Sequence, residues 1–313
     1  MRYDPAMQIG MLGLGRMGGN MARRLARTGI GVVAWDRASE ARAALAGEPG
    51  LQTVETLEEF IAALTTPRIV WLMLPAGAPT DTTLDILAAR LTAGDLLVDG
   101  GNAHYQDSQR HAAALAASGL QFVDAGVSGG VWGLQNGYGL MVGGEATAVA
   151  RLEPVLRALA PSPERGWLHC GRAGAGHYAK MVHNGIEYGL MQAYAEGFAL
   201  LQARPELGLD VAQLAEHWRH GTVIRSWLLD LTAEFLAQDP VLDDIAPIVA
   251  DSGEGRWTAK EAIDLGVPAP VISAALMARF ASQGRADYAA RLLARMRQSF
   301  GGHATTPADK PPP

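Results

Sequence analysis

Four polar side chains that could move protons or bind a polar ligand recur at helical spacing within residues 180–188 (KMVHNGIEY). They are Lys180, His183, Asn184 and Glu187. In a helix, positions i, i+3, i+4 and i+7 share one face, so the four side chains would project together. Lys180 and Glu187 would stand about 10 Å apart along the axis, which leaves room for a small substrate between them. The spacing by itself is also typical of a solvated amphipathic helix.

A second candidate is Ser128 in residues 126–130 (GVSGG), which match the G-x-S-x-G pattern of hydrolase nucleophiles. A nucleophilic serine needs a base that a third group orients, and no histidine context in the sequence suggests one. We therefore do not expect Ser128 to be a nucleophile. The other glycines of 127–144 are expected to form tight turns, and Trp132 is expected to pack beneath this loop.

A third motif is G-x-G-x-x-G at residues 13–18 (GLGRMG). It follows an apolar run expected to be a strand and opens a segment rich in helix formers, which is the context of a dinucleotide site. The first glycine permits a tight turn, the second lets a pyrophosphate approach, and the third lets helix and strand pack closely. The free N–H groups of the helix would face the phosphates. The predicted cofactor residues here are Gly13, Leu14, Gly15, Arg16, Met17 and Gly18.

An acidic residue, Asp36, follows the next expected strand at residues 30–35. A carboxylate there binds the ribose hydroxyls and repels a 2′-phosphate, which favours NAD over NADP. Arg37 could pair with a 2′-phosphate, so NADP stays possible. Ligands of open α/β sheets lie at the carboxyl ends of the strands. Residues that follow later strands should therefore also face the cofactor: Leu74, Pro75, Ala76 and Asn102.

The elements that must position these groups alternate along the first part of the chain. Strands are expected at 7–12, 30–35, 69–74, 95–99 and 121–124, and helices at 17–27, 41–46, 54–64, 84–91 and 108–118. This alternation predicts an α/β, Rossmann-type doubly wound domain over residues 1–175. A long helix at 176–203 opens an all-helical domain, 176–303. Residues 304–313 are Pro-rich and are expected to be a mobile tail.

Composition narrows the function classes. The net charge of −6 argues against nucleic acid as a partner, because phosphate backbones need a basic surface. The single cysteine, Cys170, excludes a disulfide framework and a multi-cysteine zinc site, and we expect no metal. His217 and His220 have no further ligand cluster and are expected at the surface. The absence of a signal peptide and of a membrane-length apolar run indicates a cytoplasmic protein with no membrane contact.

From Gln8 to His303 the sequence resembles the decarboxylating 6-phosphogluconate dehydrogenases, particularly their short-chain, NAD-preferring form within the β-hydroxyacid dehydrogenase superfamily. Its most specific segments are 127–133 (VSGGVWG) and 180–188 (KMVHNGIEY). The others are IGMLGLGRMGGN at 9–20, LVDGGN at 97–102, LMVGG at 140–144 and RQSFGGH at 297–303. Related β-hydroxyacid dehydrogenases keep the lysine that matches Lys180. They do not keep the run HNGIEY that stands here at residues 183–188.

The resemblance implies a reaction. The C3 hydroxyl of 6-phosphogluconate is oxidised, the β-keto acid loses CO2, and the enediol is protonated at C1 to give ribulose 5-phosphate. Lys180 would act as general base and then acid at the C3 oxygen, which requires a pKa depressed by burial or by the cationic nicotinamide. Glu187 would protonate C1. The matching substrate positions are Asn102, Ser128, Gly129, Gly130, His183, Asn184, Tyr188, Arg279, Arg297 and His303.

The resemblance also implies a homodimer or homotetramer, because the tail pair Arg297 and His303 would bind the phosphate of the neighbouring subunit's substrate. The chain departs from the family in four places. Longer members carry a lysine in a K-G-T-G-K-W-like loop, whereas residues 251–257 (DSGEGRW) are shorter and hold Glu254 and Arg256. Most of the large duplicated helical domain is missing, and Ala103 and Gly139 replace the expected Ser and Cys.

Two alternatives remain open from the sequence. A β-hydroxyacid dehydrogenase that does not decarboxylate, of the 3-hydroxyisobutyrate type, would keep Lys180 but would not need Glu187 as an acid. A catalytically silent nicotinamide-binding sensor would not need either side chain. The intact Lys180, Asn184 and Glu187 face argues against the sensor.

Overall fold

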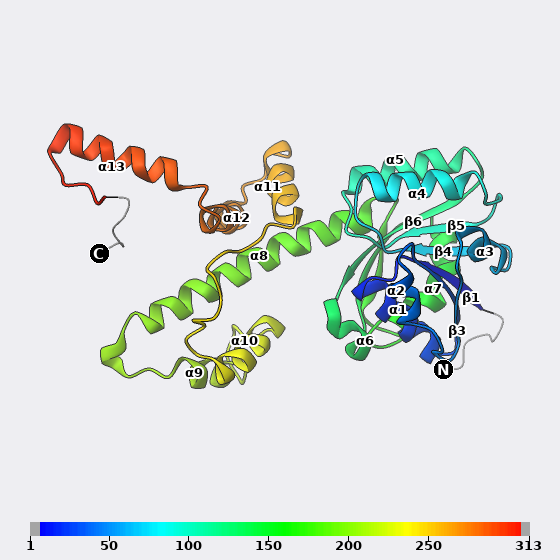
Figure 1. The fold of residues 1–313 in the computed structure, drawn as a ribbon, viewed down its shortest axis with the longest axis horizontal. Helices are drawn as coiled ribbons and strands as arrows, with labels where there is room; N and C mark the ends of the chain where they lie inside the picture. Colours follow the sequence, from blue (N-terminus) through cyan, green and yellow to red (C-terminus); the bar gives the residue numbers. More distant parts are fainter. Residues whose placement is uncertain (1–6, 308–313) are drawn as a thin grey trace. The chain divides into compact units, whose positions relative to one another are not determined.

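The computed structural model describes residues 7–307, and the chain forms two compact units that divide after Met181 (Figure 1). The division falls inside the long helix α8 (Ala175–Gln202), a few residues beyond the boundary at 175/176 expected from the sequence. Of the expected tail, residues 304–307 belong to no helix or strand, and 308–313 lie outside the described residues.

The first unit is built on an eight-stranded sheet with the strand order β3-β2-β1-β4-β5-β6-β7-β8. Strands β1 to β6 are parallel to their neighbours, β7 runs antiparallel to β6, and β8 is parallel to β7. The strands are β1 (Gln8–Leu12), β2 (Gly31–Trp35), β3 (Leu51–Thr53), β4 (Ile69–Leu72), β5 (Leu96–Asp99), β6 (Gln121–Ser128), β7 (Gly139–Gly144) and β8 (Trp167–Gly171).

Helices cover both faces of this sheet, as the doubly wound prediction requires (Figure 1). Apolar side chains of α1 and α7 share a core with one face, and those of α3, α4 and α5 share a core with the other. The helices are α1 (Arg16–Arg27), α2 (Ser39–Ala43), α3 (Leu57–Ala62), α4 (Ala78–Ala88), α5 (Tyr105–Ala116), α6 (Gly133–Asn136) and α7 (Ala146–Leu159), with a 3₁₀ turn at Gly130–Trp132.

The five predicted strands are all present, but three strands and α7 were missed. β3 has only three residues and directly precedes the helix predicted at 54–64. α3 is shorter than predicted because the Thr56 side chain caps it and it begins at Leu57. β7 (GLMVGG) is half glycine, and β8 (WLHCG) carries no run of buried apolar residues. Gly139, Gly143 and Gly144 therefore belong to a strand and not to turns, whereas Gly137 ends α6 with φ 83° and does form a turn. Glycine has low strand propensity, which hid this element.

The start of α8 is held by a buried carboxylate, that of Asp124 in β6. Asp124 Oδ1 accepts the Gly174 N–H at 2.6 Å, and Oδ2 accepts the His177 N–H at 2.8 Å. These are N–H groups that the first turn of a helix cannot satisfy internally. Burial raises the pKa of Asp124, although His177 and the two N–H groups favour the ionised form. The side chain thus ties α8 to the middle of the sheet.

Three glycines let α8 lie directly against β6 and β7. A Cβ on Gly126 would stand 2.3 Å from the Cβ of Lys180. One on Gly143 would stand 2.7 Å from the Gly176 nitrogen, and one on Gly176 would stand 2.4 Å from the Met141 carbonyl oxygen. Real Cβ atoms do not approach this closely, so any side chain at these positions would push the helix away from the sheet. Gly126 and Gly143 therefore serve as packing surface for α8.

The second unit is helical and has two small cores. After α8 it contains α9 (Val211–Trp218), α10 (Trp227–Gln238), α11 (Glu254–Asp264), α12 (Pro270–Ser282) and α13 (Asp287–Gly301), with a 3₁₀ turn at Pro205–Leu207. One core joins α9 and α10, and the other gathers Tyr188, Ala259, Ala275 and Leu276. Among residues 7–307, no helix combines the length and the apolar composition that a membrane span needs.

Asp124→Ala should destabilise the protein by about 2–4 kcal/mol, because two buried N–H groups would lose their acceptor at once. Chemical denaturation followed by circular dichroism measures this difference. Asp210→Ala is the matched control, since Asp210 is exposed and its side chain accepts one backbone N–H, that of Gln213, at the start of α9. Asp210→Ala should lower the free energy of unfolding by about 1 kcal/mol. Equal costs for the two variants would contradict a special role for Asp124.

Candidate functional site

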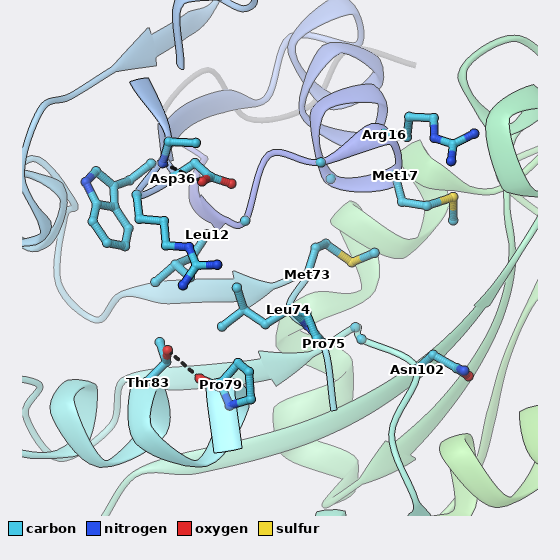
Figure 2. A pocket seen from close by; sticks show the side chains of 18 of the residues that line it. Leu12, Arg16, Met17, Asp36, Met73, Leu74, Pro75, Pro79, Thr83 and Asn102 are labelled. Carbon is cyan, nitrogen blue, oxygen red and sulfur yellow. Dashed lines mark hydrogen bonds between the residues drawn. The ribbon is translucent and has the colours of Figure 1, made fainter. Parts of the chain in front are cut away.

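A cavity of ≈ 970 Å³ opens at the carboxyl ends of the parallel strands in the first unit. The strand order reverses between β1 and β4, which is the place where open α/β sheets bind ligands. Figure 2 shows Asp36 on one side of the cavity and Asn102 on the other, with Met73 and Leu74 between them. Predicted cofactor residues that line the cavity are Gly13, Gly15, Arg16, Met17, Gly18, Asp36, Arg37, Leu74, Pro75 and Asn102.

The glycine turn at the N-terminus of α1, residues 13–18, has the geometry that its motif requires. Gly13 has φ 93°, and a Cβ there would stand 2.5 Å from the Met73 carbonyl oxygen. A Cβ on Gly18 would stand 2.0 Å from the Gly13 oxygen, so only glycine allows α1 to pack here. A Cβ on Gly15 would meet no atom within 4 Å, and Gly15 lines the cavity. Two of the glycines therefore shape the turn, and Gly15 faces the space for a ligand.

Asp36 is fixed by two backbone donors. Its Oδ2 accepts the Leu14 N–H at 2.7 Å, and its Oδ1 accepts the Ala38 N–H at 2.9 Å. The Arg42 guanidinium supports the same segment by donating to the Asp36 carbonyl at 2.8 Å. Each carboxylate oxygen keeps a second lone pair, so Asp36 can still accept from two hydroxyl groups.

Two predicted cofactor residues do not line the cavity. Leu14 is buried, and its N–H is committed to Asp36, so it supports the site from behind. Ala76 is also absent from the lining, although Pro75 before it and Ala78 at the start of α4 do line the cavity. Gly100, Gly101 and Val127 line it too, in segments that the sequence placed around the same crevice. Sequence reasoning missed eight other residues that line the cavity: Leu12, Trp35, Ala38, Met73, Ala78, Pro79, Thr82 and Thr83. Trp35 and Met73 lie at strand ends, a signal that could have identified them.

Ser128 is the last residue of β6 and pairs with Gly139 of β7. The next two residues, Gly129 and Gly130, have φ 129° and 53°, so the backbone turns sharply at this point. Within residues 7–307, no hydrogen bond joins Ser128 to a histidine, and the hydrolase arrangement is not formed. Val127 lines the cavity, which places Ser128 next to its edge.

The prediction that Trp132 packs beneath the glycine loop was wrong, since Trp132 is 44% exposed. Tyr138 takes that place and is fully buried against Gly133, where a Cβ would stand 1.9 Å from the ring. Burial raises the pKa of Tyr138 to about 12, opposed by the positive charge of Arg24. Arg24 also donates to the Leu134 and Ala160 carbonyls, at 3.2 and 2.7 Å, and so ties the segment after the loop to α1.

Lys180 lies in the second turn of α8, inside the first unit, with its Cβ against Gly126. The Asp124 contacts to Gly174 and His177 fix the turn that immediately precedes it. His177 is itself buried, and its ring Nδ1 lies 2.7 Å from Ser108 Oγ. The position of the Lys180 backbone therefore depends on Asp124, His177 and Ser108, none of which the sequence identified as part of the site.

The other polar residues of α8 form the expected face in the second unit. His183 Nδ1 lies 3.0 Å from Asn184 Oδ1 and 3.8 Å from Glu187 Oε2, so the three side chains are in reach of one another. Ile186, which lies between these polar residues in the sequence, is 53% exposed. Tyr188, in contrast, is buried in one of the two cores.

Two of the residues predicted to bind phosphate meet in the second unit. The Arg279 guanidinium carbon lies 3.5 Å from the Tyr188 ring centroid, and Tyr188 Oη lies 3.2 Å from Ser252 Oγ. Arg297, on α13, and His303, just beyond it, are both exposed.

A metal centre finds no support in the described chain. Between residues 7 and 307, no three histidine, cysteine, aspartate or glutamate side chains gather closely enough to hold an ion. His217 and His220 are exposed as expected, and His220 Nε2 lies 3.1 Å from Glu216 Oε1.

A doubly wound sheet with a G-x-G-x-x-G turn and an acidic residue at its switch point defines a nicotinamide-dinucleotide-binding dehydrogenase. Residues 8–171 match the model of the NAD binding domain of 6-phosphogluconate dehydrogenase, and residues 176–310 match that of the 6-phosphogluconate dehydrogenase C-terminal domain. The chain therefore belongs to the 6-phosphogluconate dehydrogenase family.

The chain is similar to three known proteins in sequence or structure. The NAD(+)-dependent, decarboxylating 6-phosphogluconate dehydrogenase of Haloferax volcanii is 43% identical over 97% of this chain and 100% of its own length. The 6-phosphogluconate dehydrogenase of Plasmodium falciparum, solved with NADP+ and with 6-phosphogluconate, has a TM-score of 0.81 and 29% identity over 97% of this chain and 67% of its own. A Mycobacterium tuberculosis 3-hydroxyisobutyrate dehydrogenase has a TM-score of 0.70 and 26% identity, covering 90% and 94%.

Gly15→Ala should leave the fold intact but weaken dinucleotide binding, because a Cβ there meets no protein atom and projects where a ligand must approach. Gly13→Ala is the matched comparison and should cost about 1–3 kcal/mol of stability, owing to its positive φ and the Met73 carbonyl. Thermal unfolding and fluorescence titration with NAD measure both properties. A Gly15→Ala protein that binds NAD as tightly as the wild type would show that the pyrophosphate does not cross this turn.

Proposed function

We propose that the protein oxidises and decarboxylates 6-phosphogluconate to ribulose 5-phosphate and CO2, with a nicotinamide dinucleotide as hydride acceptor. The proposal depends on one observation: Lys180 and Glu187 both lie on α8, two turns apart, in a chain that matches both domains of the family. The Haloferax relative, which this chain matches over its whole length, is named for the same reaction.

Lys180 is proposed to take the proton of the C3 hydroxyl as hydride leaves C3. Bound NAD would accept that hydride. The same amine, now protonated, then donates to the C3 oxygen while the bond to the carboxyl carbon breaks and CO2 departs. A β-keto acid needs no metal for this step once its carbonyl is polarised by a proton donor. Anchoring of the first turn of α8 by Asp124 supports a fixed Lys180 position.

Glu187 is proposed to protonate C1 of the enediol that remains. It lies two turns after Lys180 on α8, about 10 Å along the axis, which suits proton transfer to a different carbon of the same substrate. His183 lies within 4 Å of Glu187 and can orient it. Asn102, Ser128 and Asn184 are proposed to hold the substrate hydroxyl and carboxyl groups.

A dehydrogenase of the 3-hydroxyisobutyrate type is the competing assignment, since such a protein shares the fold. An enzyme that oxidises its hydroxy acid but leaves the carboxyl group in place would need no second proton donor on α8. The presence of Glu187 beside His183, which also contacts Asn184, supports decarboxylation instead.

NAD is proposed as the preferred acceptor. Asp36 is held rigidly by Leu14 and Ala38 at the edge of the cavity, where its charge would repel a 2′-phosphate. Arg37 also lines the cavity and leaves some use of NADP open. The Haloferax relative is named NAD(+)-dependent, which agrees with this preference.

A spectrophotometric assay with 6-phosphogluconate and either cofactor, coupled to CO2 detection, tests the reaction. Wild-type protein should release one CO2 for each reduced nicotinamide and should favour NAD in kcat/KM. Glu187→Gln should lower kcat by roughly 10²–10⁴, because the proton donor to C1 is lost. Glu196→Gln, the same change at an exposed position of α8, should have no effect. Reduced nicotinamide without CO2 would instead indicate a simple hydroxyacid dehydrogenase.

We also propose that the protein is a homo-oligomer whose interface includes α13. The exposed apolar residues of this helix fall on one face: Tyr288, Leu292, Leu293 and Met296. A contiguous apolar helix face exposed to water marks a binding surface, and a second copy of the chain would present the same face. Completion of the phosphate site by Arg297 and His303 of a neighbouring subunit would follow from such an interface.

Sedimentation equilibrium of the wild type should give the mass of two or more chains of 33.1 kDa each. Leu293→Glu should shift the protein towards the monomer, because it places a charge in the apolar face. Gln298→Glu, on the opposite side of α13, is the control and should leave the mass unchanged. A wild-type monomer at micromolar concentration would disprove the interface.

A further inference from the structure

The two residues that would choose between NAD and NADP, Asp36 and Arg37, lie in a segment with little structure of its own. Residues 36–38 belong to no strand or helix, and the helix that follows, α2, has five residues and an N-cap, Ala38, without a side-chain acceptor. Both Asp36 and Arg37 line the cavity, and they act in opposite directions, because a carboxylate repels a 2′-phosphate and a guanidinium attracts one. Selectivity therefore depends on how the backbone of this segment presents them.

Arg42, in the last turn of α2, holds this backbone. Its Nη1 donates to the Asp36 carbonyl at 2.8 Å and to the Arg37 carbonyl at 3.4 Å. The carbonyl and the carboxylate of Asp36 belong to the same residue, so fixing the peptide limits the directions in which the side chain can point. The carboxylate is held as well, because its two oxygens accept the N–H groups of Leu14 and Ala38.

The guanidinium of Arg42 is held in turn by Glu55, in the segment between β3 and α3. Arg42 Nη2 lies 2.6 Å from Glu55 Oε2, and the Arg42 side chain is only 12% exposed. Glu55 is anchored through its backbone, since its N–H donates to Glu59 Oε2 at 2.9 Å and its carbonyl accepts the indole N–H of Trp35 at 3.3 Å. Trp35 lines the cavity, so Glu55 supports both Arg42 and an aromatic wall of the site.

Arg37 has no comparable anchor. Within residues 7–307 its side chain makes no hydrogen bond or ion pair, so its guanidinium is free to turn towards a phosphate. The charge of Arg42, in contrast, is compensated by Glu55, and its Nη donors are used by the two carbonyls and by that carboxylate. Loss of the Arg42 contacts would release the segment and let it present Arg37 in place of Asp36.

We propose that Arg42, paired with Glu55, is a positioning residue that sets the selectivity for NAD over NADP by fixing the backbone of Asp36 and Arg37. Neither Arg42 nor Glu55 lines the cavity, so the pair acts through the residues that do. The inference rests on the proposed preference for NAD. It adds that this preference depends on an ion pair outside the cavity.

The experiment measures kcat and KM of the wild type and its variants with NAD and with NADP at saturating 6-phosphogluconate, and the dissociation constant of each dinucleotide by fluorescence titration. Arg42→Gln should lower the NAD/NADP ratio of kcat/KM, and of the binding constants, roughly tenfold, with kcat for NAD changed by less than about twofold. Arg42→Lys should give an intermediate ratio, because an ammonium lacks the fixed fork of a guanidinium. Glu55→Gln should shift the ratio in the same direction but by less, since its amide oxygen still accepts from Arg42.

Arg23→Gln is the matched control. Arg23 also pairs with one carboxylate, that of Glu48 at 2.7 Å, and donates to one carbonyl, that of Ala44 at 2.7 Å, but it does not line the cavity or contact residues 36–38. Its replacement should lower the thermal unfolding temperature without changing the NAD/NADP ratio.

The outcomes separate this inference from the function on which it rests. If the wild type prefers NAD and Arg42→Gln keeps the wild-type ratio, the inference is wrong and the preference stands. If Arg23→Gln lowers the ratio as much as Arg42→Gln, a general loss of stability explains the effect and the inference is wrong. If the wild type binds NAD more tightly than NADP without turning over 6-phosphogluconate, and Arg42→Gln lowers the binding ratio, the inference stands and the proposed reaction fails. A wild type that prefers NADP contradicts both the preference and the inference.

Discussion

The buried carboxylate of Asp124 determines where α8 begins, and much of the proposed chemistry depends on that helix. Asp124 lies on β6 and accepts the N–H groups of Gly174 and His177, which the first turn of a helix cannot satisfy internally. Burying a carboxylate is unfavourable unless such donors meet it, and its raised pKa records that cost.

The glycines around this carboxylate follow from the same constraint. Because α8 approaches β6 and β7 at backbone distance, Gly126, Gly143 and Gly176 cannot carry side chains. Lys180 is then set against Gly126, one turn after the fixed start of the helix. A group that must take and return a proton at one atom gains from this rigidity, since small misplacements of a catalytic group are costly. In the stretch that resembles a nucleophile elbow, Gly126 is therefore a packing surface for a helix, whereas Gly129 and Gly130 form a turn.

In the cofactor cavity, too, one side chain supports two parts of the site. Asp36 holds the glycine turn through the Leu14 N–H, so the residue that would select the ribose also shapes the phosphate-binding turn. A change at Asp36 should alter both functions together. In the second unit, the 250–251 segment plays a similar supporting part, because it orients Arg256 and Arg279 through one carboxylate and one carbonyl.

The sequence by itself determined the features that depend on neighbours along the chain. The glycine turn at 13–18, the acid at Asp36, the five apolar strands and the helical face of His183, Asn184 and Glu187 all follow from local spacing, since backbone geometry fixes a period of 3.6 in helices and the turn in G-x-G-x-x-G. The order of these elements was sufficient to predict the doubly wound fold.

Only the tertiary structure decided the features that depend on residues distant in sequence. Asp124 meets Gly174 and His177 some fifty positions later, and no local pattern announces that contact. Strand β7 forms despite its glycines because β6 and β8 supply its partners, and Tyr138 displaces Trp132 from the core because Gly133 leaves space for its ring. Arg256, Arg279 and Tyr188 are likewise brought close together by packing between helices. The spacing of residues within any single segment does not encode such packing.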